Sequence, residues 1–75
     1  MNDLYIYMIY EKPAAFPNSF VVLRDVVGGD KPRRDLSFRL VGHDIDAIRI
    51  FLSKQGLAKL MPAVGEDPKI VEYWI

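Results

Sequence analysis

Hydrophobic and polar positions along the chain predict three consecutive strands near its start. Residues 4–10 (LYIYMIY) and 20–27 (FVVLRDVV) are rich in aromatic and β-branched side chains, a composition typical of strands. Residues 35–41 (DLSFRLV) alternate apolar and polar side chains, which predicts a third, half-exposed strand. Its apolar face is expected to carry Leu36, Phe38 and Leu40.

The next segment, GHDIDAIRIFLSKQG at residues 42–56, predicts the one helix. We expect Asp44 to cap its N-terminus and Gly56 to end it. On a helical wheel the apolar stripe consists of Ile45, Ile48, Phe51 and Leu52. Ile50 falls among the polar positions, so it is either a contact residue or a solitary exposed isoleucine.

Residues 69–75 (KIVEYWI) predict a last strand and complete the order β-β-β-α-β. We therefore expect a single α+β domain over residues 1–75, with a four-stranded mixed, mostly antiparallel sheet and one helix packed on one face. A right-handed crossover through the helix would make the last strand parallel to the third. The expected strand order is 3-2-1-4, because the first and last strands are apolar on both faces.

The second face of this sheet needs a cover of its own, because one helix covers only one face. One possible cover is internal and consists of the loop residues Ala14, Ala15, Phe16, Leu57, Leu60, Met61 and Val64. The other is a second copy of the chain, and we expect a homodimer formed face to face or by pairing of exposed edges. The candidate interface residues are Tyr5, Tyr7, Ile50 and Tyr73. A different protein, in place of a second copy of the chain, is the alternative partner.

Composition and charge restrict the partners. Ten Lys and Arg balance ten Asp and Glu, and a net charge of zero gives no general attraction to nucleic acid or anionic membranes. The apolar run at residues 4–10 is too short to cross a bilayer and lacks a signal peptide's positive flank, so we expect a cytoplasmic protein without membrane contact. Cysteine is absent and histidine occurs once, so no disulfide, metal or cofactor is expected.

Catalytic chemistry has little support in the sequence. His43 lies beside Asp44 and Asp46, where a histidine can act as a general base, but no Ser or Cys nucleophile stands at a recognisable spacing. Glu66 and Asp67 fit ordinary turn chemistry. We expect no catalytic residues, and a small enzyme is the third hypothesis after two kinds of binding protein.

The second kind is a nucleic-acid-binding protein. Five basic residues surround the second hairpin: Arg24, Lys31, Arg33, Arg34 and Arg39. A basic ribbon can follow a phosphate backbone, but Asp25, Asp30 and Asp35 are interleaved with these residues. Charged residues at strand ends also protect a sheet edge from aggregation. Nucleic-acid binding is therefore the alternative to assembly.

Several segments resemble a group of small bacterial proteins. These segments are the aromatic first strand, FPNSFVV at residues 16–22, the helix start at Asp44 and EDPKIVEYWI at residues 66–75. The group shares FP-x-x-aromatic-VV and DP-x-IVE-x-W features, and the similarity covers most of the chain. The shared motifs belong to strands and turns, so the resemblance implies a bacterial cytoplasmic protein and no activity. The leading hypothesis is a small binding or assembly module.

Overall fold

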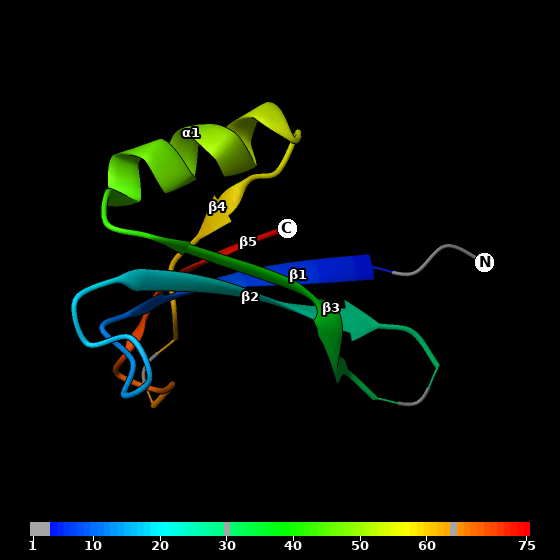
Figure 1. The fold of residues 1–75 in the computed structure, drawn as a ribbon. Helices are drawn as coiled ribbons and strands as arrows, with labels where there is room; N and C mark the ends of the chain where they lie inside the picture. Colours follow the sequence, from blue (N-terminus) through cyan, green and yellow to red (C-terminus); the bar gives the residue numbers. More distant parts are fainter. Residues whose placement is uncertain (1–3, 30, 64) are drawn as a thin grey trace.

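The computed structural model describes residues 4–29, 31–63 and 65–75, and the expectations for Asp30 and Val64 lie outside this range. Its elements are β1 (Leu4–Glu11), β2 (Phe20–Val27), β3 (Arg33–Gly42), α1 (Ile45–Lys54), β4 (Lys59–Leu60) and β5 (Ile70–Trp74). They form two layers, with α1 on one face of a five-stranded sheet (Figure 1). The expected α+β class is confirmed.

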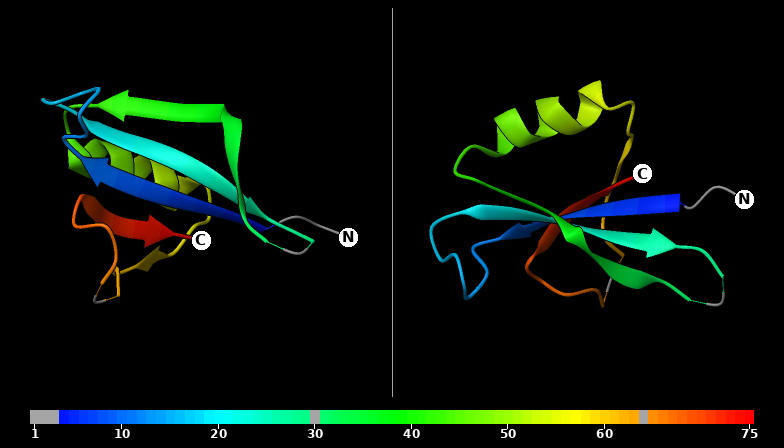
Figure 2. Two further views of the ribbon diagram at one scale, coloured as in Figure 1. Left: turned by 90° about the horizontal axis from the view of Figure 1, so that it is seen from below. Right: turned by 45° about the vertical axis from the view of Figure 1, so that its right-hand side comes forward.

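The strands are ordered β3-β2-β1-β5-β4 across the sheet (Figure 2, left). This order confirms the neighbours expected for the first three strands and the last. Two details were wrong: the sheet has five strands rather than four, and all neighbours are antiparallel, so that β5 runs opposite to β3. Both differences come from β4. It runs parallel to β3, and the chain then turns back, so that β5 enters between β4 and β1.

Both ends of α1 form as expected. Asp44 precedes the helix in an extended conformation, and its Oδ1 accepts hydrogen bonds from the backbone N–H groups of Asp46 at 2.9 Å and Ala47 at 3.4 Å. These bonds satisfy donors that have no partner within the first helical turn. After the last helical residue, Gly56 adopts φ of +82°, a left-handed conformation that glycine tolerates best. The N-terminal cap and the stop signal are thus both confirmed.

The hydrophobic core lies between α1 and the sheet. Its buried members are Ile9 of β1, Val22 of β2, Ile48 and Leu52 of α1, and Trp74 of β5. In the sheet register Ile9 lies opposite Val22, and residues that lie opposite each other point to the same face. This face is therefore the one that α1 covers.

The opposite face, called the second face below, is covered in part by the chain itself. Met8 and Val21 belong to it, and they are only 5% and 3% exposed. The loop at residues 12–19 folds onto it, with Pro13 and Phe16 beside Val21. Figure 1 shows this loop and residues 65–69 on the side of the sheet away from α1. Of the internal cover expected from the sequence, the loop with Phe16 lies over this part of the sheet, whereas Leu60 and Met61 are exposed and Leu57 packs against the core under α1.

β3 is interrupted by a bulge in its first half. Leu23 pairs with Arg39 and Asp25 pairs with Arg34, so that Arg24 alone lies opposite four residues, 35–38. The strand bends sharply there (Figure 2). The side chain of Leu36 is 92% exposed at the bend, whereas Phe38 and Leu40 pack against the core. The expectation that these three residues share one apolar face was wrong, because the bulge breaks the alternation.

Candidate interaction surface

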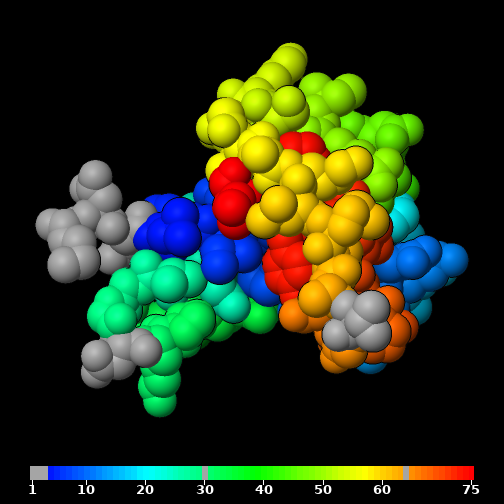
Figure 3. Space-filling view, turned by 180° about the vertical axis from the view of Figure 1, so that it is seen from behind, coloured from blue at the N-terminus to red at the C-terminus, as the bar shows by residue number. Residues whose placement is uncertain are grey.

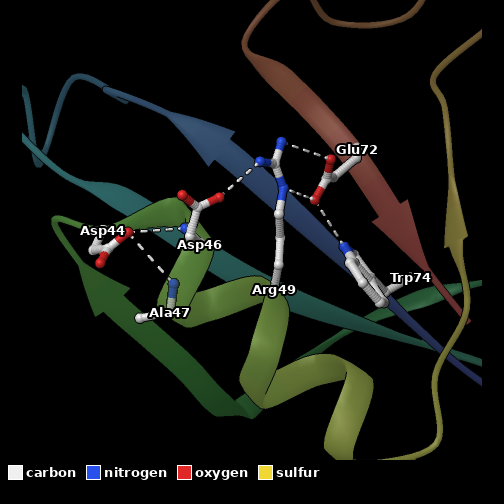
Figure 4. Close-up of polar contacts among 6 residues, drawn as sticks. All are labelled: Asp44, Asp46, Ala47, Arg49, Glu72 and Trp74. Atoms are coloured by element: carbon white, nitrogen blue, oxygen red, sulfur yellow. Dashed lines mark hydrogen bonds and ion pairs between the residues drawn. The ribbon is translucent and has the colours of Figure 1, made fainter.

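A buried carboxylate fixes α1 to the sheet. Glu72 of β5 is 1% exposed and accepts hydrogen bonds from Arg49 Nε at 2.9 Å and Arg49 Nη2 at 3.2 Å (Figure 4). The indole Nε1 of Trp74 donates a third bond at 3.1 Å. Burial alone would raise the pKa of Glu72, but the bonds from Arg49 and Trp74 outweigh it and lower that pKa. Glu72 is therefore an ionised structural anchor and not a proton donor.

Sequence reasoning missed this anchor, although a signal for it existed. Glu72 occupies the position between Ile70 and Trp74 on the face of β5 that points to the helix. A carboxylate at a buried position requires a cation on the facing element. Arg49, which lies one residue after Ile48 on α1, was the available partner.

Two of the proposed interface tyrosines are engaged within the chain. The guanidinium of Arg24 lies 4.4 Å from the ring centroid of Tyr5, 5.7 Å from that of Tyr7 and 4.9 Å from that of Phe38. Tyr7 and Phe38 also form an edge-to-face pair with centroids 5.3 Å apart. Arg24 Nε donates to Asp35 Oδ2 at 2.8 Å. This cluster connects the bulge of β3 to β1 and β2.

The four proposed interface residues do not share a surface. Tyr7 lies opposite Trp74 in the register, on the face toward α1, whereas Tyr73 lies opposite Met8 on the second face. Ile50 is 56% exposed and belongs to the helical layer. The structure therefore separates Tyr73 from Tyr5, Tyr7 and Ile50.

The five basic residues of the alternative hypothesis are also divided. Arg24 is paired with Asp35 on the side of α1, whereas Arg34 Nε donates to Asp25 Oδ1 at 2.5 Å on the second face. The guanidinium of Arg39 lies 5.3 Å from the ring of Phe16 in the loop that covers the second face. Lys31, which precedes β3, and Arg33, its first residue, are exposed. Arg34 and Arg39 line one hollow, but Arg24 lies on the other side of the sheet, so the three arginines do not form one strip along which a phosphate backbone could run.

His43 has a structural contact at the end of β3. Its Nδ1 lies 3.1 Å from the backbone oxygen of Asn18 and 3.4 Å from Ser19 Oγ. These contacts connect the loop at residues 12–19 to the start of the helix. Over residues 4–29, 31–63 and 65–75, no three His, Cys, Asp or Glu side chains converge in a way that could hold a metal ion.

A group of exposed apolar residues lies elsewhere, on the part of the second face that the loop at residues 12–19 leaves open. We call it the apolar patch and define it as Leu4, Ile6, Leu60 and Ile75. Leu4 and Ile6 alternate with Tyr5 and so share a face with Met8, while Leu60 lies opposite Tyr73 on that same face. Leu4 is 52% exposed, Leu60 48% and Ile75 42%. Figure 3 shows the start of β1, β4 and the end of β5 adjoining one another at the molecular surface.

The two sheet edges are poorly suited to pairing with another strand. β3, at one edge, is interrupted by the bulge at residues 35–38. β4, at the other edge, is only two residues long and carries Lys59. Bulges, short strands and lysine are ordinary devices that prevent edge pairing. The apolar patch is therefore a better candidate for contact with a partner than either edge.

Comparisons of the sequence with protein-family models and curated proteins, and of the fold with solved structures, found no match. The resemblance to small bacterial proteins accordingly stays a prediction. In the part of the chain that the structure describes, α1 is the only helix, and its ten residues are too few and too polar to cross a membrane.

Proposed function

We propose that this chain is a non-enzymatic assembly module that forms a two-fold homodimer through the apolar patch. The observation that carries this proposal is the position of Leu4, Leu60 and Ile75, which are 42% to 52% exposed on a sheet face that the loop at residues 12–19 covers only in part. Isolated exposed apolar residues are common, but a group of them on one face marks an interaction site. A domain of 75 residues also gains much from further burial, because a small domain buries a smaller fraction of its chain's surface on folding than a large one does.

A second copy of the chain is the partner that the charges favour. The net charge is zero, so two copies approach each other without general repulsion. The ion pair of Asp25 and Arg34 lies on the second face next to Ile6, which is opposite Asp25 in the register. Each copy thus carries a negative and a positive charge at the border of the apolar contact, and two-fold symmetry allows the negative charge of one copy to face the positive charge of the other. The same surface therefore complements itself.

The test is the molar mass in solution, measured by light scattering on a size-exclusion column over a series of concentrations. We expect the wild-type protein to elute at twice its chain mass of 8.6 kDa. Leu60→Asp places a charge in the patch and should give a folded monomer. Ile50→Asp is the matched control, because Ile50 is similarly exposed at 56% but lies in the helical layer, and this variant should remain a dimer.

A wild-type monomer at every concentration would overturn the proposal. A dimer that survives Leu60→Asp but is lost in Ile50→Asp would move the interface to α1. Co-elution with nucleic acid that disappears as salt is added would support the basic hairpin as the functional surface instead.

A further inference from the structure

A separate hollow lies on the second face, toward the end of β1 and away from Leu4. Its volume is about 350 Å³, which falls within the range of small-ligand sites. Val21 and Leu23 of β2 line it, together with Tyr10, the loop residues Pro13, Ala15 and Phe16, and Arg39. The hollow is thus mainly apolar and aromatic, with one cationic side chain.

The loop that forms one wall is held in place by its own hydrogen bonds. Lys12 N–H donates to the backbone oxygen of Ser19 at 2.9 Å, Phe16 N–H to Pro13 at 2.8 Å and Ser19 N–H to Phe16 at 3.2 Å. The contact between His43 and Asn18 adds a connection to the end of β3. The wall therefore exists before any ligand arrives, which reduces the entropy cost of binding.

Arg39 differs from Arg24 and Arg34, which are both paired with a carboxylate. Arg24 pairs with Asp35 and Arg34 pairs with Asp25, but no carboxylate of residues 4–29, 31–63 or 65–75 lies within ion-pair distance of Arg39. The ring of Phe16, 5.3 Å from its guanidinium, positions it beside the hollow. A guanidinium held on one face by a ring still presents its N–H edge, which matches the two oxygens of a carboxylate.

We propose that this hollow binds a small amphipathic monocarboxylate. The aromatic or aliphatic body of the ligand packs against Val21, Leu23 and Phe16, and its carboxylate pairs with Arg39. The single cation sets the charge of the ligand at minus one. This site does not depend on the homodimer, because none of its lining residues belongs to the apolar patch.

The test is a titration of the isotope-labelled protein with phenylacetate, followed by the backbone amide signals in two-dimensional NMR spectra. Phenylacetamide is the matched neutral probe, because it has the same ring and nearly the same shape. We expect phenylacetate to shift the signals of Ala15, Phe16 and Val21 in a saturable manner. The amide should bind about tenfold more weakly, because it cannot form a charge-assisted pair.

Two substitutions on β3 complete the experiment. Arg39→Gln should weaken phenylacetate binding about tenfold, to the level of the amide, while Arg39→Lys should retain part of the difference between acid and amide. Arg33→Gln removes the same charge from the same strand outside the hollow and should leave the affinity unchanged. Equal affinity for acid and amide, an equal loss in Arg33→Gln, or shifts confined to residues outside the hollow would overturn the proposal. Light scattering on the same samples reports the dimer independently of the ligand.

Discussion

Arg49 of α1 and Glu72 of β5 form a two-bond ion pair across the boundary between helix and sheet. The carboxylate is 1% exposed, whereas the arginine side chain is 37% exposed. Only one partner is thus removed from water, and its negative charge depends on the other for compensation. The pair fixes the position of α1 along the sheet, because a buried carboxylate without its cation is costly.

Arg49→Met should therefore destabilise the fold. The change leaves the Glu72 carboxylate buried with only the Trp74 indole as a side-chain donor. We expect the free energy of unfolding to fall by about 3 kcal/mol, the low end for a broken buried pair, because Arg49 is partly exposed. Urea unfolding followed by circular dichroism measures this loss. The double variant Arg49→Met with Glu72→Gln should recover part of it, and a double variant as unstable as the single one would contradict the proposed cause.

Acid should destabilise the protein through two carboxylates. Hydrogen bonds from Ser37 and then the pairing with Arg24 lower the pKa of Asp35 from its ordinary 3.8 to about 2, and the pKa of Glu72 is also lowered. Both groups therefore add stability that is fully present above their unfolded pKa values and is lost as the pH falls through the folded ones. Unfolding free energies measured from about pH 5 down to about pH 2 should fall steadily. Asp35→Asn should show a shallower decline, and an unchanged slope in that variant would count against this assignment.

Tyr73 should ionise at unusually high pH. Its phenol donates a hydrogen bond to Glu66, and this bond, with a smaller effect of burial, raises the pKa of Tyr73 from 10.0 to about 12. A raised pKa means that this contribution to stability is complete below the unfolded value and is lost as the pH rises through the folded one. NMR of ring-labelled tyrosine measures the titration directly. Glu66→Gln should return the pKa toward 10.0, whereas the same curve in both proteins would exclude Glu66 as the cause.

The features that the sequence predicted well depend on few neighbouring residues. Asp44 caps α1 through bonds to residues two and three positions later, and Gly56 ends it through its own backbone conformation. The need to cover both faces of the sheet was also readable, because β1 and β2 are apolar at successive positions. Such signals are local, so they do not depend on the tertiary contacts of the fold.

The errors all involve contacts between distant segments. β4 is two residues long and is extended because it pairs with β5, with bonds between Ala58 and Ile75 of 2.8 Å and 3.0 Å beside it. The bulge of β3 depends on Arg24, which binds Asp35 from another strand. Local alternation cannot reveal either contact, so the strand count and the exposure of Leu36 were wrong.

The candidate interaction surface was likewise predictable where local periodicity determines it and not where contacts between distant segments do. Periodicity indicated an apolar second face, but it did not reveal which half of that face the loop at residues 12–19 would cover. Tyr5 and Tyr7 were chosen for their aromatic character, yet they stack with Arg24 on the other side of the sheet. Leu4 and Leu60 became candidates only because the strand register places them on the same face of the sheet.

The insertion of β5 between β1 and β4 also determines the order of events during synthesis. Tyr7 lies opposite Trp74, so two strands at the centre of the sheet come from segments more than sixty residues apart. A chain still attached to the ribosome can form the β1-β2-β3 meander and the helix, but it lacks the strand that supplies Trp74 to the core. Sheets dominated by such distant pairings fold slowly, and their unpaired strands are exposed to aggregation meanwhile. We therefore expect the core to close only after residues 70–74 have left the exit tunnel.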